Sequence, residues 1–255
     1  MTPTPGVLDP AELRAVAEQF GVADVQVRRD HLISHVLAAI EGVDGVVFYG
    51  GTALTRTVLP DLRLSEDIDL MAVRPRSAVA RDLVAAIDRG LARSFGEVRW
   101  QPPLEMTRDA QSATLEVQGR LSVQVQVVTQ TGRAVLPTQR RDITQRYSDA
   151  PPVVLETLTD AGFAAAKISA WLDRSAERDL FDLHAMSQSG LLTTNAIGLV
   201  REQTNWTASP ERVVWPQPPS EADWQMQLGH QTRLMVDADT AHRLVVETLR
   251  RLDQP

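Results

Sequence analysis

The chain has 255 residues, 43% of them hydrophobic, with a formal net charge of −7 and no cysteine. This composition supports a folded core and excludes disulfides, thiolate zinc sites and a thiol nucleophile, so any metal must be held by oxygen ligands or histidine. The negative charge argues against a protein that coats nucleic acid, although a local arginine patch could still contact RNA. No stretch approaches the roughly 18 to 20 uninterrupted apolar residues of a membrane span, and the N-terminus lacks a signal-peptide pattern, so we expect a cytoplasmic protein without a membrane partner.

The hydrophobic patterns predict helices and a sheet in the first part of the chain. Helices are expected from Pro10, over 30–40 and over 77–95; strands are expected over 46–49, 64–73, 97–100, 113–117 and 121–128. The pair Pro151-Pro152 marks a domain boundary. We therefore predict an α+β domain over 1–150 and a mainly helical domain over 151–255.

The second part is expected to contain helices over 160–172, 176–187 and 239–252. Three tryptophans, Trp206, Trp215 and Trp224, lie in a proline-rich segment that we interpret as a loop packed over these helices. Their irregular spacing leaves base stacking as the alternative.

Two glycines follow the first predicted strand. The run Val46 to Tyr49 is apolar and β-branched or aromatic, and it stops at Gly50-Gly51-Thr52. Glycines let the backbone approach a ligand closely, and Thr52 is interpreted as the N-cap of a short helix over 53–59. Because the N-terminus of a helix attracts anions, this turn is a candidate phosphate site.

Two carboxylates follow on the next predicted strand. Asp67 and Asp69 have the same parity, so both side chains point to one face of the sheet. Two neighbouring acids repel each other unless a cation lies between them, and oxygen ligands of this kind suit Mg²⁺ held jointly with substrate phosphates. A phosphate turn followed by paired carboxylates indicates nucleotidyl transfer. The alternative is a tight turn and an exposed strand with solvated acids.

These stretches resemble a known family. Residues 48–54 (Phe-Tyr-Gly-Gly-Thr-Ala-Leu) and 65–70 (Ser-Glu-Asp-Ile-Asp-Leu) are similar to the first two signatures of the AbiEii/AbiGii toxin family, whose MenT-like members belong to type IV-like toxin–antitoxin systems. The third and fourth signatures, a helical lysine and an Arg-Asp-x-x-Asp segment, match Lys167 and residues 178–182. The resemblance spans roughly residues 28 to 187 and implies an α+β, polymerase-β-like core of mixed sheet and flanking helices.

Lys167 is also singled out by composition, because it is the one lysine in a chain with 26 lysines and arginines. An ammonium is a compact charge that can reach one phosphate oxygen. On one unbroken helix Lys167 and Asp179 would lie about 18 Å apart. A turn near Ser175, interpreted as the N-cap of the following helix, could bring them together.

The third carboxylate that polymerase-β-like enzymes often carry on a neighbouring strand is missing. Gln124 and Gln126 occupy the polar face of the predicted strand 121–128. Glu116 and Asp182 are candidates for the missing acid, and a site with Asp67, Asp69 and Asp179 alone is the other possibility.

The resemblance implies an enzyme that moves a nucleotide from a nucleoside triphosphate to an acceptor hydroxyl, with Asp67, Asp69, Lys167 and Asp179 as catalytic residues. Asp67 and Asp69 are expected to hold Mg²⁺, with Mn²⁺ as the alternative. Gly50, Gly51, Thr52, Ser65 and Lys167 are expected to contact the nucleotide phosphates. Asp179 is either a base toward the acceptor or a group that orients Lys167.

The expected acceptor is the 3′ end of tRNA, with inhibition of translation and growth as the outcome and a winged-helix antitoxin as partner. An antibiotic or protein acceptor is the second hypothesis. A folded module that binds a nucleotide without turnover is the third.

Overall fold

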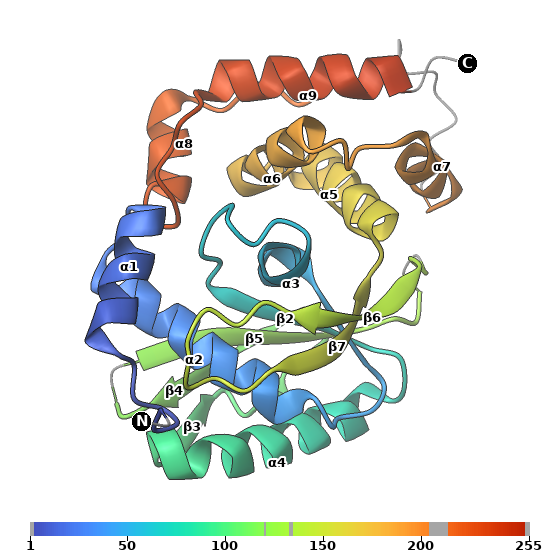
Figure 1. Cartoon of the computed structure of the whole chain (residues 1–255). Coiled ribbons are helices and arrows are strands. Elements are labelled where there is room, and N and C mark those ends of the chain that lie inside the picture. The colour runs from blue at the N-terminus through green and yellow to red at the C-terminus, as the bar shows by residue number, and fades with distance from the viewer. Residues whose placement is uncertain (1–2, 120, 133–134, 204–213, 253–255) are drawn as a thin grey trace. The chain divides into compact units, whose positions relative to one another are not determined.

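The computed structural model describes residues 3–119, 121–132, 135–203 and 214–252. The chain divides into two compact units: unit 1 comprises residues 1–133 and 139–157, and unit 2 comprises residues 134–138 and 158–255 (Figure 1). The Pro151-Pro152 pair is followed by one more strand, whose residues up to Thr157 belong to unit 1.

Unit 1 is built on a seven-stranded sheet in the order β3-β4-β5-β2-β1-β7-β6. Its strands are β1 Val46–Tyr49, β2 Asp67–Ala72, β3 Val98–Gln101, β4 Ser112–Val117, β5 Leu121–Thr129, β6 Thr138–Ile143 and β7 Val153–Leu158. Strand β2 pairs antiparallel with β1 and parallel with β5, and β1 pairs parallel with β7. The predicted mixed sheet is confirmed.

Strands β6 and β7 were not anticipated from the sequence. Strand β6 ends the order of the sheet, and its residues are mostly exposed or half-buried. An edge strand of this kind carries no run of alternating apolar residues, which is the signal on which strand prediction rests.

One face of the sheet is apolar. Ile68 and Leu70 of β2 and Val125 and Val127 of β5 are fully buried. Two helices, α2 Asp24–Ile40 and α4 Arg76–Phe95, pack together and contact β5, and they cover one face of the sheet (Figure 1). Helix α4 forms where predicted, whereas α2 begins six residues before the expected Asp30.

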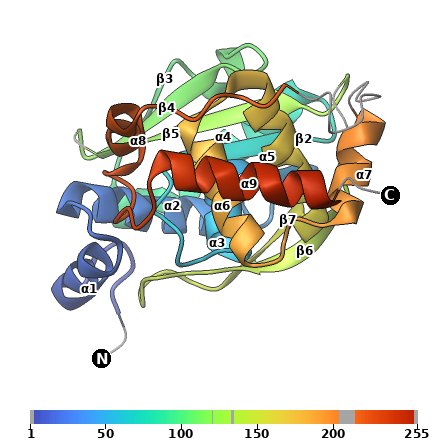
Figure 2. The ribbon, with the colours of Figure 1, turned by 90° about the horizontal axis from the view of Figure 1, so that it is seen from above.

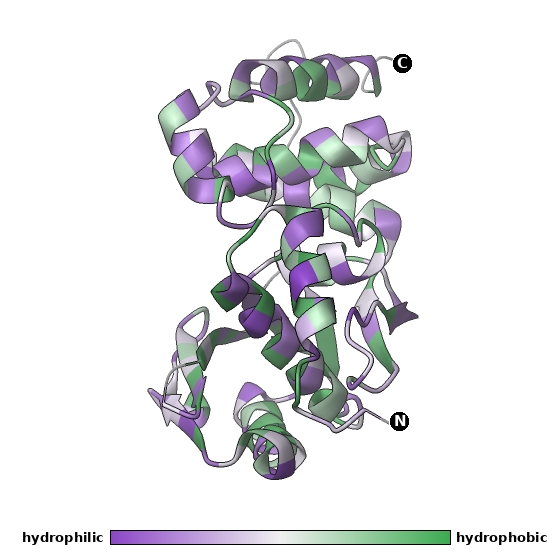
Figure 3. Ribbon diagram, turned by 60° about the vertical axis from the view of Figure 1, so that its left-hand side comes forward, coloured by the Kyte–Doolittle hydropathy of each residue, from purple (hydrophilic) through white to green (hydrophobic). Residues whose placement is uncertain are grey.

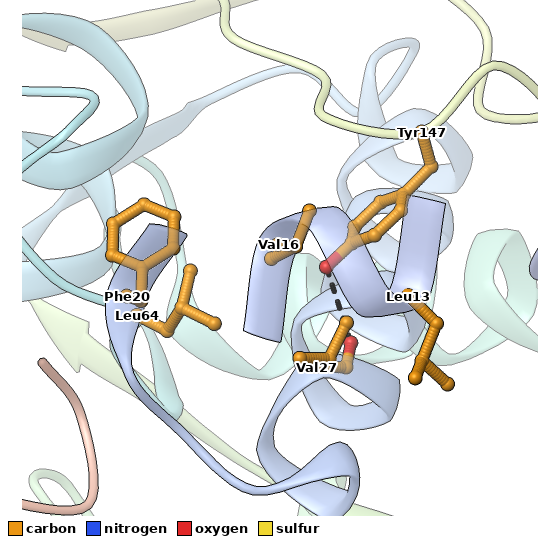
Figure 4. Close-up of a cluster of buried hydrophobic side chains, with 6 residues drawn as sticks. All are labelled: Leu13, Val16, Phe20, Val27, Leu64 and Tyr147. Carbon is orange, nitrogen blue, oxygen red and sulfur yellow. Dashed lines mark hydrogen bonds between the residues drawn. The ribbon is translucent and has the colours of Figure 1, made fainter. Parts of the chain in front are cut away.

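The first helix, α1 Pro10–Phe20, begins at the predicted proline, and the side chain of Asp9 caps it by accepting from the N–H of Ala11 and of Glu12. It packs on α2 through a buried apolar cluster: Leu13, Val16, Phe20, Val27, Leu64 and Tyr147 (Figure 4). The Tyr147 hydroxyl donates to the carbonyl of Val27 over 3.1 Å, which ties the segment before β7 to α2. Unit 1 also contains α3 Gly50–Thr57 and a 3₁₀ helix, η1 Leu104–Met106.

A buried arginine joins three segments of unit 1. Arg56, on α3, is 0% exposed, and its Nη2 donates to a carboxylate oxygen of Asp30 over 2.7 Å. Its Nη1 donates to the Ser34 hydroxyl and to the Thr144 carbonyl. Because Asp30 and Ser34 lie on α2, this guanidinium fixes α3 against α2 and against the chain beyond β6.

The described part of unit 2 is helical: α5 Asp160–Arg174, α6 Glu177–Gln188, α7 Thr194–Gln203, α8 Glu221–Leu228 and α9 Ala238–Leu252. Helix α6 contacts α5, α8 and α9, and α7 contacts α5 (Figure 2). Hydrophilic and hydrophobic residues alternate along the α9 ribbon (Figure 3), as expected for a helix with one buried face. No helix in the described ranges combines the length and hydropathy of a membrane span.

The tryptophans of the proline-rich segment pack inside unit 2. Trp215 stacks on Trp171 with ring centroids 6.1 Å apart, and Trp224 is 0% exposed with its ring edge-to-face against Phe181. Packing rather than base stacking is therefore confirmed for these two, although Trp224 lies on α8 where a loop was predicted. Trp206 falls outside the described residues.

Replacing Arg56 by methionine is expected to lower the free energy of unfolding by about 3–5 kcal/mol, because it leaves the buried Asp30 carboxylate without its closest cation. Urea unfolding followed by circular dichroism measures this loss. Arg99→Ala, which breaks an exposed ion pair with Glu97, serves as the control and should unfold like the parent chain. Equal stability of the two variants would contradict the structural role of Arg56.

Candidate active site

The glycine turn lies at the end of β1. Helix α3 begins directly at Gly50, so Gly50, Gly51 and Thr52 form its first turn, and Tyr49 occupies the N-cap position without a side-chain cap. The prediction of Thr52 as N-cap was wrong. Its hydroxyl instead donates to the backbone carbonyl of Asp67, which fastens the start of the helix to β2. The first N–H groups of α3 have no partner within the helix, as an anion site requires.

Glycine is required at position 50 for two reasons. Its φ is +79°, a backbone conformation that residues other than glycine rarely adopt. A Cβ at this position would also lie 2.1 Å from Oδ2 of Asp69. The turn and the carboxylate strand are thus in direct contact, as the pairing of Tyr49 with Asp69 across β1 and β2 demands.

Asp67 and Asp69 share one face of the sheet. They alternate along β2 with the fully buried Ile68 and Leu70, and both acids are half-buried. Glu66 faces the other way and pairs with Arg29 of α2, on the side that the helices cover. The predicted parity of the two carboxylates is therefore seen in the fold.

An arginine and a serine lie against the second glycine. A Cβ on Gly51 would lie 2.6 Å from Nη2 of Arg63 and 3.2 Å from Oγ of Ser65. Both side chains belong to buried residues. Ser65, which was expected close to the carboxylates and the phosphates, lies beside the turn, and Arg63 adds a positive charge that the sequence analysis did not identify.

Glutamines stand beside the paired carboxylates. In the parallel register of β2 and β5, Gln124 is the partner of Asp67 and Gln126 is the partner of Asp69. Asp67, Asp69, Gln124 and Gln126 together form a polar strip across β2 and β5. The amide of Gln126 donates to the carbonyl of Ala110 over 2.6 Å, which gives it a structural role at the edge of this strip. The neighbouring strand therefore offers amides and no carboxylate at these two positions.

Glu116 is too far away to complete a metal site with Asp67. It pairs with Ser122, two residues before Gln124 on β5, and β4 is separated from β2 by β5. Two strand spacings and two residues place its Cα about 12 Å from that of Asp67. Asp182, the other candidate for a third acid, is an ion-pair partner inside unit 2.

In unit 2, Lys167 is buried between two aspartates. Its Nζ lies 2.9 Å from Oδ1 of Asp179 and 2.7 Å from Oδ2 of Asp182, and both carboxylates are 0% exposed. Arg174 contacts both oxygens of Asp179, with its Nε 2.7 Å from Oδ2 and its Nη2 3.1 Å from Oδ1. Two cations and two anions thus form one compact cluster. Lys167 is therefore not the exposed surface residue that a single lysine on an amphipathic helix would suggest.

The turn that brings Lys167 and Asp179 together was predicted near Ser175. Ser175 has φ +54° and ends α5 in the left-handed conformation, and its N–H bonds back to the carbonyl of Trp171. The expectation that Ser175 caps the next helix was wrong, because Ala176 occupies the N-cap position of α6. Because the chain reverses direction at this turn, Lys167 and Asp179 are in direct contact, whereas on one unbroken helix they would be far apart.

The environment of Asp179 favours its ionised form. Burial raises the pKa of this carboxyl, but the charge of Lys167 and the hydrogen bond and charge of Arg174 outweigh burial, so the pKa lies below its ordinary value. A carboxylate with a lowered pKa and no exposed surface is a poor base toward an external hydroxyl. The arrangement suits a group that orients Lys167.

Comparisons with known proteins agree with the motifs. The model of the family described as nucleotidyl transferase AbiEii toxin, type IV toxin–antitoxin system, matches residues 31–245. No curated protein matches the chain. Among solved structures, MenT4, a nucleotidyltransferase toxin of Mycobacterium tuberculosis, is similar over 98% of this chain and 91% of its own, with 22% identity and a TM-score of 0.70. An H. pylori protein assigned as a nucleotidyltransferase is similar over 91% of this chain and 96% of its own, with 13% identity and a TM-score of 0.54.

Gly50→Ala is expected to destabilise the chain by about 1–3 kcal/mol, because the new Cβ collides with Asp69 and the left-handed backbone is strained. The matched control is Gly42→Ala, whose Cβ would meet nothing within 4 Å. Urea unfolding of both variants tests the contact. Equal stability would show that Asp69 does not lie against the turn.

Asp179→Asn is expected to cost stability in a pH-dependent way. The folded pKa lies below the unfolded one, so the stabilisation by ionised Asp179 is present above about pH 4 and is lost as the pH falls through the folded pKa. The difference in unfolding free energy between parent and variant should be constant from pH 7 to 5 and shrink at lower pH. Asp173→Asn controls for the loss of one exposed negative charge nearby; a pH-independent difference for Asp179→Asn would refute the assignment.

Proposed function

Because the chain belongs to the AbiEii nucleotidyltransferase toxin family of type IV toxin–antitoxin systems, we propose that it transfers a nucleotide from a nucleoside triphosphate to the 3′ end of tRNA. The reaction is proposed to depend on Mg²⁺, with Mn²⁺ as a substitute. The observation that carries this proposal is the direct contact between the glycine turn and Asp69, which joins a phosphate cradle to a carboxylate strand.

The residues at this site fit a magnesium ion. Asp67 and Asp69 present carboxylates on one face of β2, and the amides of Gln124 and Gln126 are their register partners on β5. Mg²⁺ is commonly held by one or two carboxylates together with substrate phosphates. Asp67 and Asp69 would hold the ion, which when bound neutralises phosphate charge and polarises the phosphorus under attack.

The side chains around the turn would bind the triphosphate. The first N–H groups of α3, which have no partner within the helix, would donate to phosphate oxygens, and glycine at 50 and 51 leaves room for the phosphates. The Ser65 hydroxyl and the Arg63 guanidinium lie against Gly51, where they would add a donor and a positive charge. These groups would hold the leaving pyrophosphate.

The family resemblance implies that Lys167 stabilises the negative charge of the nucleotide phosphates. Its ammonium is held between Asp179 and Asp182, so its direction is fixed. Asp179, itself held by Arg174, is proposed as the residue that orients Lys167 rather than as the base.

The biological role that we propose is based on the family resemblance. A toxin that blocks the 3′ end of tRNA would stop translation and growth, and a cognate winged-helix antitoxin is the proposed partner. Because the net charge is −7, tRNA would have to be bound by local groups of arginines. Arg140 and Arg141 on β6 are candidates, because that strand is the exposed edge of the sheet.

Incubation with Mg²⁺, total bacterial tRNA and each α-³²P nucleoside triphosphate in turn tests the proposal. Label is expected on the tRNA 3′ end, and it should fall at least about 100-fold in Asp67→Asn and Asp69→Asn, since metal ligation contributes several kcal/mol to the transition state. Glu116→Gln is the matched control, because it neutralises an acid on β4 about 12 Å from Asp67.

Three results would contradict parts of the proposal. Loss of activity in Glu116→Gln would make that residue the third acid after all. Label on a protein or small molecule in place of tRNA would refute the acceptor and keep the chemistry. No label with any acceptor, from folded protein free of antitoxin, would favour a module that binds the nucleotide without turnover.

A further inference from the structure

Two histidines and an aspartate converge inside unit 1, apart from the carboxylates of β2. His31 and His35 are one turn apart on α2, and Asp149 comes from the segment before β7. Their exposed fractions are 3%, 7% and 8%. Among the described residues this is the one group of three or more histidine, aspartate and glutamate side chains whose ligand atoms all lie within 4.8 Å of one another.

The ligand atoms lie slightly closer together than those of a tetrahedral metal site. The two Nε2 atoms are 3.3 Å apart, and the Nε2 of His35 lies 2.9 Å from Oδ2 of Asp149. The Nε2 of His31 lies 3.0 Å from each carboxylate oxygen. Zinc bonds of 2.0–2.2 Å at tetrahedral angles place ligand atoms about 3.3 Å apart, so a shift of a few tenths of an ångström would admit the ion.

The same distances also suit hydrogen bonds. With a proton on each Nε2, both imidazoles donate to the Asp149 carboxylate, which has lone pairs for both. A metal ion would replace both protons and bind the same three side chains, so metal uptake distinguishes the two arrangements.

A backbone contact fixes the carboxylate of Asp149. The backbone N–H of Gly6 donates to Oδ2 of Asp149 over 2.8 Å. Such a second contact orients a ligating carboxylate.

We propose that His31, His35 and Asp149 bind one Zn²⁺ ion. Two imidazole nitrogens select zinc over magnesium. Asp149 supplies a carboxylate oxygen as the third ligand, 2.9 Å from the Nε2 of His35, and a water would complete the tetrahedron. Position 32, where zinc proteases of the His-Glu-x-x-His type carry their glutamate base, is a fully buried leucine. The site is structural rather than hydrolytic.

The ion would fasten three parts of unit 1 together. Asp149 lies 114 residues from His35 in sequence, and it holds Gly6 of the N-terminal segment. Tyr147, two residues before Asp149, packs edge-on against His31 and donates to Asp30. Zinc would therefore stabilise the same helix, α2, that holds Arg56 of α3.

The test is metal uptake by the full chain after removal of any affinity tag. Protein treated with a chelator is loaded with Zn²⁺, desalted and measured by elemental mass spectrometry. About one zinc per chain is expected, together with a higher melting temperature than the metal-free protein and no such uptake of Mg²⁺. Co²⁺ in place of Zn²⁺ should give the intense visible absorption of a tetrahedral site.

Variants assign the ion to these residues. Zinc content should fall to near zero in His35→Ala and Asp149→Asn, and stay at one in His230→Ala and in the double variant Asp67→Asn/Asp69→Asn, which removes the proposed magnesium ligands. Retention of zinc in His35→Ala or Asp149→Asn would overturn the assignment. So would failure of folded parent protein to take up Zn²⁺ or Co²⁺, which needs no variant and would leave a hydrogen-bonded cluster only.

Discussion

The buried guanidinium of Arg56 is the constraint on which the candidate phosphate turn depends. Helix α3 is only eight residues long, too short to be stable without packing. Arg56 joins it to Asp30 and Ser34 of α2 and to the carbonyl of Thr144. At the other end of α3, the Thr52 hydroxyl bonds to the backbone of Asp67. The turn at Gly50 is therefore held at both ends of its helix.

Much of the fold follows from the sequence. The α+β class, the mixed sheet and the AbiEii family were predicted and are confirmed, because buried strands and amphipathic helices leave strong periodic patterns. The polar edge strand β6 leaves no such pattern. The predicted start of α3 was three residues too late, because Gly50 and Gly51 were assigned to a loop before the helix, whereas they belong to its first turn.

The site divides in the same way between what spacing reveals and what tertiary contacts decide. The common face of Asp67 and Asp69 and the reversal between Lys167 and Asp179 could be predicted from period and turn residues. Arg63 and Arg174 could not, since an arginine in a loop or at a helix end is usually solvated. Arg63 is identified only because its guanidinium lies where a Cβ on Gly51 would be, and Arg174 only by its two contacts with Asp179. Their roles in the reaction stay predictions.

The glutamines of β5 have a consequence for the order in which ligands bind. With two acids and two amides in register, this strip carries one negative charge fewer than a site with three acids. Fewer anionic ligands attract a bare divalent cation less strongly, and they also repel an incoming triphosphate less. The magnesium ion proposed for this site is then expected to arrive already bound to its nucleotide. Occupancy would follow the concentration of that complex rather than the level of free metal in the cell.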